Sequence, residues 1–324
     1  MKKLALFALL FLLACGPSKP LVSESLVKNK SIKIDFAKEE DVASRLAFLA
    51  SDANEGRDTG SEGIEKASVF LEDLMRESNI KPYFKTYRDT LSNFDKPAYN
   101  IVGYIEGNDA TLKNEFVIIG AHYDHIGKIA AVNGDEIANG ANDNASGSTA
   151  VTEVMQYFAK NKTNKRSLIF VFFSAEEKGL LGSKHLAKKL KNQNLNLYFM
   201  FNFEMIGVPM QNRDFLLYIT GFGKTNMASK MNEYAGEKII GYISAETKYQ
   251  LFRASDNYPF YTAFDVPAQT VSTFDFENFE FYHKPDDEFE LMDTKHMTNV
   301  VNTMIPILEI MMNKPTKEIT INDK

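Results

Sequence analysis

Two adjacent glutamates, Glu176 and Glu177, follow a strongly apolar run in the segment LIFVFFSAEEKGLLGS. Neighbouring carboxylates repel each other, and both are costly to bury unless a positive group receives them. One interpretation is a solvated turn in which the pair caps the next helix. The other is a metal site in which the two carboxylates have different roles. A metal site would require further ligands elsewhere in the chain.

Further imidazole and carboxylate groups stand at the ends of expected strands or in loops: His122, Asp143, Glu204 and His283. Nitrogen and oxygen ligands without a thiolate suit zinc or another first-row divalent ion. Each of these residues also has a structural alternative, since a histidine after a strand is commonly hydrogen-bonded and Asp143 could cap a helix. We interpret His125, His185 and His296 in this structural way. The group as a whole favours a metal site.

Strand-length apolar runs that alternate with amphipathic helical patterns must position these residues. The runs lie at residues 100–107, 115–124, 167–177, 197–207, 215–221 and 266–273. The helical patterns lie at residues 39–53, 60–78, 146–161, 179–192, 225–237 and 293–313. This alternation predicts an α/β fold with a mixed, largely parallel central sheet between helical layers. Ligands of such sheets bind at the carboxyl ends of strands, where the candidate residues gather.

The bulk properties of the chain limit its class. With 324 residues, of which 44% are hydrophobic, the chain can form one large α/β domain. Its formal net charge of −6 provides no basic field, which argues against a nucleic-acid partner.

The N-terminal segment MKKLALFALLFLLACG has the pattern of an export signal. Its apolar run is shorter than the about 20 residues that span a bilayer, and it fits a signal-peptide core. The sequence LLAC resembles the bacterial lipobox, and Cys15 is the single cysteine of the chain. We therefore expect a lipoprotein signal peptide at 1–15, and an exported bacterial lipoprotein anchored to a membrane through Cys15, facing the periplasm or the exterior. An ordinary secretory signal with a chance cysteine is the alternative.

Four parts of the chain are expected. A polar tether at 16–35 follows the signal peptide, a single catalytic domain spans 36–314, and a polar tail occupies 315–324. Loops such as 128–140 and 242–262 are expected to build a substrate pocket.

Five motifs, GAHYDHIG, GANDNASGSTAV, FSAEEKGLLGS, NFEMIG and FYHKPDDE, resemble the M28 family of zinc aminopeptidases in order and spacing. The stretch LASDANEGRDTGSEG resembles the N-terminal segment of that family, so the likeness covers about residues 40–313. It implies a three-layer α/β/α sandwich of the phosphorylase/hydrolase-like type that holds a pair of zinc ions.

The resemblance also implies a role for each motif residue. The implied ligands are His122 and Glu204 on the first zinc, Glu177 and His283 on the second, and Asp143 bridging both. Glu176 would be the general base instead of a ligand, which would give the two adjacent glutamates different roles.

Two residues depart from the family pattern. Glu204 stands where the family commonly has aspartate, and Asn257 stands where it often has histidine. The family also has a cis peptide after its bridging aspartate, which predicts one between Asp143 and Asn144.

Supporting roles follow from the chemistry of metal ligands. A ligating histidine usually donates its other N–H group to a carboxylate, which fixes the ring. Asp124 is the candidate partner of His122, and Asp287 is the candidate partner of His283, although Asp287 could instead lie in an exposed acidic turn. Candidates for binding the oxyanion or the substrate are Tyr258 and Arg253.

The implied reaction is removal of the N-terminal residue from peptides with a free N-terminus, by a zinc-held water with Glu176 as base. A glutaminyl cyclase with a single zinc is one alternative, but His122 and a bridging Asp143 favour two ions. A non-catalytic binding protein on the same fold is another, although such proteins lose ligands that this chain retains. A carboxypeptidase would usually need an arginine to clamp the substrate carboxylate, and no motif singles one out.

Overall fold

The computed structural model describes residues 32–322 of the chain. The expected signal peptide with Cys15, and the expected tether as far as residue 31, lie outside the described residues. No helix among residues 32–322 is long and apolar enough to cross a membrane.

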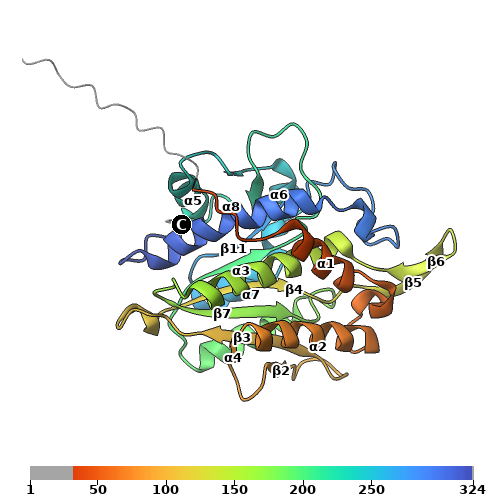
Figure 1. The fold of residues 1–324 in the computed structure, drawn as a ribbon, viewed down its shortest axis with the longest axis horizontal. Coiled ribbons are helices and arrows are strands. Elements are labelled where there is room, and N and C mark those ends of the chain that lie inside the picture. The colour runs from red at the N-terminus through yellow and green to blue at the C-terminus, as the bar shows by residue number, and fades with distance from the viewer. Residues whose placement is uncertain (1–31, 323–324) are drawn as a thin grey trace, which may run out of the picture. The chain divides into compact units, whose positions relative to one another are not determined.

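A nine-stranded mixed sheet lies between two layers of helices (Figure 1). Its strands are β1 (Lys81–Pro82), β2 (Arg88–Thr90), β3 (Tyr99–Ile105), β4 (Phe116–His122), β7 (Ser167–Phe173), β8 (Leu197–Phe203), β9 (Leu217–Ile219), β10 (Ile240–Gly241) and β11 (Ala268–Ser272). The helices are α1 (Glu39–Leu49), α2 (Glu62–Glu77), α3 (Gly147–Asn161), α4 (Leu181–Asn192), α5 (Met227–Ala235), α6 (Ser244–Lys248), α7 (Asn257–Phe264) and α8 (Thr294–Asn313).

The strand order is β1-β3-β7-β4-β8-β11-β9-β10, and β2 pairs with β3. The four central strands β7, β4, β8 and β11 run parallel to one another, while β3 runs antiparallel to β7 and β9 runs antiparallel to β11. The carboxyl ends of the central strands therefore meet at one edge of the sheet, which is the usual binding edge of α/β folds.

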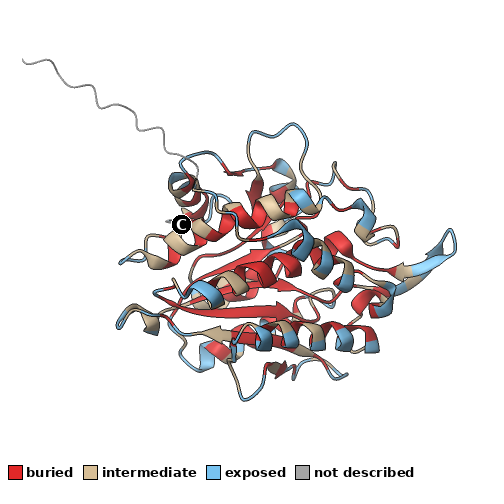
Figure 2. Cartoon of the chain, viewed as in Figure 1, coloured by how far each residue is buried: buried red, intermediate tan, exposed pale blue. Residues whose placement is uncertain are grey.

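Alternate residues of each central strand pack into different helical layers, because side chains in a strand point to opposite faces. In β4, Val117 and Ile119 join the core formed with α1, α2, α3, α5 and α8, whereas Ile118 joins the core formed with α4 and α7. Both faces of the sheet are thus dry, which explains the uninterrupted apolar runs in its strands. Figure 2 shows the central strands as buried and the outward-facing sides of the helices as exposed.

Several elements lie where the sequence predicted loops. The expected loop 128–140 is mostly a two-stranded hairpin of β5 (Gly127–Val132) and β6 (Asp135–Ala138), and the expected loop 242–262 contains α6 and most of α7. In the segment expected to be a polar tail, Ile319 is buried, and its N–H donates to the Tyr198 hydroxyl at 2.9 Å.

Candidate active site

The carboxyl edge of the sheet brings the five predicted ligands together. β4 ends at His122, β7 leads into the turn with Glu176 and Glu177, and β8 leads directly to Glu204. Asp143 comes from the helical turn Ala141–Ser146, which opens α3, and His283 from the segment between β11 and α8. Their side chains belong to two groups of candidate ligands. Within each group the ligand atoms all lie within 4.8 Å of one another, and Asp143 belongs to both groups.

The first group consists of His122, Asp143 and Glu204. His122 Nε2 lies 3.3 Å from Asp143 Oδ1 and 3.2 Å from Glu204 Oε1. The other ring nitrogen, His122 Nδ1, lies 3.0 Å from the backbone carbonyl oxygen of Asp124. A proton on Nδ1 would be donated to this carbonyl, which leaves the Nε2 lone pair free for a metal ion.

The second group consists of His125, Asp143, Glu177 and His283. His283 Nε2 lies 3.1 Å from Asp143 Oδ2 and 3.3 Å from Glu177 Oε2. Asp143 therefore presents one oxygen to each group. His125 Nδ1 lies 3.0 Å from Glu177 Oε1, so the interpretation of His125 as an ordinary loop residue missed its position beside two candidate ligands.

The donor atoms of both groups suit a zinc ion. They are imidazole nitrogens and carboxylate oxygens, and they converge in a largely buried region. His125 Nε2 and His283 Nε2 are buried and have no hydrogen-bond partner among the described residues. Although burial alone would raise it, contact with the His122 and His283 rings holds the pKa of Asp143 well below its ordinary value. The close carboxylates of the two ligand groups would therefore be stabilised by bound cations.

Glu176 belongs to neither ligand group. Burial, together with the nearby carboxylates of Glu204 and Asp256, raises the pKa of Glu176 well above its ordinary value. A carboxylate with a raised pKa is a stronger base, which suits a group that must accept a proton during a reaction.

Asp124 positions the turn that carries both adjacent glutamates. Its carboxylate accepts the N–H groups of Glu176 at 3.1 Å and Glu177 at 3.4 Å, and the hydroxyl of Thr59 at 3.0 Å. The Asp124 carboxylate lies 3.7 Å from His122 Nδ1, which is longer than a hydrogen bond. The residue predicted to orient His122 thus does so through its backbone carbonyl, while its side chain holds the glutamates.

Asp287 positions the loop that carries Asp143. It is fully buried, so the alternative of an exposed acidic turn is wrong. Its carboxylate accepts the N–H groups of Asn142 at 2.8 Å and Asp143 at 3.0 Å, instead of a proton from the predicted partner, His283. The peptide bond between Asp143 and Asn144 is cis, as predicted. The Asn144 side chain in turn donates to Glu204 Oε2 at 2.8 Å.

A buried arginine that the sequence analysis did not single out joins the site loops. The Arg57 guanidinium donates four hydrogen bonds, all to backbone carbonyls: Leu49 (2.6 Å), Tyr123 (2.7 Å), Asn139 (2.7 Å) and Gly140 (2.9 Å). Burial lowers the pKa of Arg57 to about 10, although the carboxylates of Asp287 and Asp143 oppose this shift. Arg57 therefore remains charged at neutral pH and ties the loops of His122 and Asp143 to the end of α1.

A small pocket opens beside the first ligand group. Its volume is about 90 Å³, and its walls include Glu176, Asp143 and Glu204 on the polar side. Most of the remaining lining is apolar or aromatic and includes Met205, Leu251, Phe274, Phe276 and Tyr282. The ring of Tyr282 stacks on His283 with centroids 3.9 Å apart. The sequence analysis missed Tyr282, although it directly precedes a predicted ligand.

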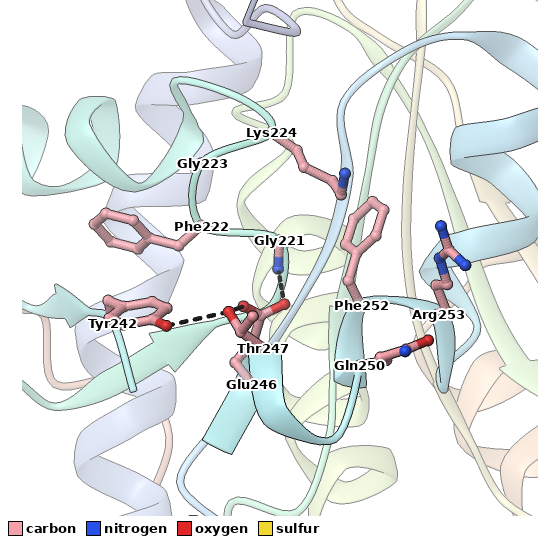
Figure 3. Close-up of a pocket in the computed structure, with 10 residues that line it drawn as sticks. All are labelled: Gly221, Phe222, Gly223, Lys224, Tyr242, Glu246, Thr247, Gln250, Phe252 and Arg253. Atoms are coloured by element: carbon pink, nitrogen blue, oxygen red, sulfur yellow. Dashed lines mark hydrogen bonds between the residues drawn. The ribbon is translucent and has the colours of Figure 1, made fainter. Parts of the chain in front are cut away.

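The structure does not bring Tyr258 and Arg253 into this pocket. Arg253 lines a separate, open pocket of about 860 Å³, where it lies near Phe252 and Gln250 (Figure 3). Tyr258 lines a further surface pocket beside α4.

Asn257, at the position where the family often has histidine, has a structural role. Its amide nitrogen lies 3.2 Å from the carbonyl oxygens of Phe252 and Ala268, and its oxygen accepts from the Thr270 hydroxyl at 2.8 Å. Asn257 therefore links α7 to β11.

Comparison with known proteins identifies related sequences and folds. The sequence model of Peptidase family M28 matches residues 100–308. Aminopeptidase YwaD of Bacillus subtilis (strain 168) is 28% identical over 215 residues, which cover 64% of this chain and 43% of that protein. The chain thus spans less than half the length of that relative.

Solved structures share the fold. The zinc aminopeptidase BSAP from Bacillus subtilis aligns with a TM-score of 0.66 and 16% identity, covering 88% of this chain and 98% of that one. Glutaminyl cyclase from Porphyromonas gingivalis aligns with a TM-score of 0.62 and 16% identity, covering 86% and 99%. These likenesses confirm the predicted three-layer α/β/α fold.

Proposed function

Because the chain belongs to peptidase family M28, we propose that it is a zinc-dependent aminopeptidase that holds two zinc ions. The observation that carries this proposal is the position of Asp143, which presents one oxygen to His122 and the other to His283. His122, Asp143 and Glu204 would hold one ion, and Asp143, Glu177 and His283 would hold the other. When bound, zinc supplies a Lewis acid that polarises a carbonyl and lowers the pKa of the attacking water.

Glu176 would move the proton of the reaction. It lines the pocket, it is absent from both ligand groups, and burial raises its pKa. Its carboxylate would accept a proton from water as the water oxygen attacks the scissile carbonyl carbon. It would then deliver this proton to the leaving amine nitrogen as the C–N bond breaks.

Tyr282 replaces Tyr258 and Arg253 as the candidate donor to the developing oxyanion. It lines the same pocket as Glu176. Burial and the carboxylates of Asp143 and Glu177 raise the pKa of Tyr282. The phenol would therefore keep its proton at neutral pH and donate a hydrogen bond.

The pocket also supports a preference for free N-termini. The carboxylates of Glu176, Glu204 and Asp143 line its polar side and would attract the positive α-amino group of a peptide. The apolar walls and the volume of about 90 Å³ suit a compact apolar first side chain.

Zinc content and substrate choice test this proposal. The full chain, loaded with zinc and dialysed, should retain two ions by mass spectrometry and hydrolyse leucine p-nitroanilide. Acetyl-leucine p-nitroanilide is the control and should remain intact, because it lacks a free amino group. One ion together with cyclisation of a glutaminyl peptide would favour the cyclase, and two ions with neither reaction would favour a binding protein.

We further propose that the chain is exported and anchored to a membrane through a lipid on Cys15. The pattern of Lys2, Lys3, the apolar run and the lipobox-like LLAC supports this. Cys15→Ser should remove incorporation of labelled palmitate and release the protein from the membrane fraction of expressing bacteria. Equal labelling of Cys15→Ser and wild type would contradict the proposal.

A further inference from the structure

His125 is fixed in the site by its own backbone and by a glycine. The side chain is fully buried, and its backbone N–H donates to the Arg57 carbonyl at 3.2 Å. Gly140 approaches the imidazole so closely that a Cβ atom at this position would lie 2.5 Å from His125 Cγ. The ring therefore occupies space that is available only because residue 140 has no side chain.

The spacing of the second ligand group fits four ligands around one ion. Neighbouring ligand atoms of a tetrahedral zinc ion lie about 3.3 Å apart, given zinc–ligand bonds of about 2 Å. His283 Nε2 lies 3.1 Å from Asp143 Oδ2 and 3.3 Å from Glu177 Oε2. His125 Nδ1 lies 3.0 Å from Glu177 Oε1 and 3.7 Å from Asp143 Oδ2. The imidazole of His125 thus points its Nδ1 atom at the same space as the other three ligands.

We propose that His125 Nδ1 is a fourth protein ligand of the ion held by Asp143, Glu177 and His283. This inference rests on the proposed function only in that it requires a bound ion. The two halves of the site would then differ, because the first group offers only His122, Asp143 and Glu204. Four protein ligands are typical of closed zinc sites, and three are typical of sites that keep a position open for water or substrate.

The pocket supports this difference between the halves. Its walls include Asp143, Glu176 and Glu204, but neither His125 nor Glu177. The substrate pocket therefore opens on the half with three protein ligands, where an open position is needed. The half with four ligands lies behind it and would hold Asp143 and His283 in place.

X-ray absorption on the zinc-loaded full chain tests the ligand directly. If His125 binds zinc, three histidines are shared between two ions. The mean number of imidazole nitrogens bound to each zinc should then be about 1.5. If His125 only donates a hydrogen bond to Glu177, the value should be about 1. A value of about 1 with two bound ions would overturn the inference and leave the proposed function standing.

Competition with a chelator provides the second readout. His125→Ala and His125→Asn should each lower the binding affinity for one of the two ions by more than about 100-fold. Loss of a residue that only hydrogen-bonds a ligand costs at most about 100-fold in metal affinity. The matched control is His185→Ala, whose ring lies outside the site beside Ser92, and it should hold both ions as the wild type does. Wild-type affinity for both ions in His125→Asn would overturn the inference, whereas failure of the wild type to hold any ion would overturn the proposed function as well.

Discussion

Glu176→Gln should hold two zinc ions as the wild type does and lose about 100-fold to 10,000-fold in kcat, the range that a general base contributes. The glutamine amide has nearly the same shape but accepts no proton at neutral pH. Because Glu176 belongs to neither ligand group, the change should leave metal binding intact. Steady-state hydrolysis of leucine p-nitroanilide and zinc content by mass spectrometry would measure both effects.

Glu177→Gln is the matched control for this experiment. It makes the same chemical change one residue further along the chain, but to a carboxylate that lies 3.3 Å from His283 and 3.0 Å from His125. We expect this variant to lose one ion, so that activity and zinc content fall together. A Glu176→Gln enzyme with near wild-type kcat and full zinc content would disprove the role of Glu176 as base.

Arg57→Met should reduce the free energy of unfolding by at least about 3 kcal/mol, because a buried carbonyl without a donor costs about 1–3 kcal/mol. Methionine fills similar space but leaves four carbonyls without the guanidinium that serves them. Urea unfolding followed by circular dichroism would measure the loss. Tryptophan fluorescence is not an option, since the chain contains no Trp.

Arg76→Met provides the comparison for a surface arginine. The Arg76 side chain is 53% exposed and pairs with Glu72 and Asp73 on the same helix. Such pairs are worth at most about 1 kcal/mol. If Arg57→Met costs no more than Arg76→Met, the four carbonyl contacts do not stabilise the fold as we infer.

The long elements of the fold could be predicted because buried elements consist largely of apolar residues. Strands β4, β7 and β8 are covered on both faces and therefore appear as uninterrupted apolar runs. Strands β1 and β10 have two residues each and exist only because a neighbouring strand pairs with them. Helix α7 is short and mostly apolar, so no amphipathic stripe marks it.

Site residues could be predicted where their side-chain chemistry defines their role. They could not be predicted where their role is to bind backbone groups of segments that are distant in the sequence. The predicted ligands carry imidazole or carboxylate groups in recognisable motifs, and the structure gathers all of them. Arg57 could not be found in this way, because its partners are carbonyl groups, which every residue has. Asp124 and Asp287 were recognised as supporting residues, but their partners proved to be backbone N–H groups of the site loops.

The wide spacing of the ligands along the chain affects when the proposed metal site can form. His122 precedes most of the sheet, whereas His283 follows its last central strand, β11. The backbone of Glu204 is itself held by β11, through a bond from its N–H to the Val271 carbonyl at 3.0 Å. A chain that ends before β11 therefore lacks His283 of the second ligand group and the strand that holds the Glu204 backbone of the first group. Neither ion of the proposed pair would be fully held in such a chain.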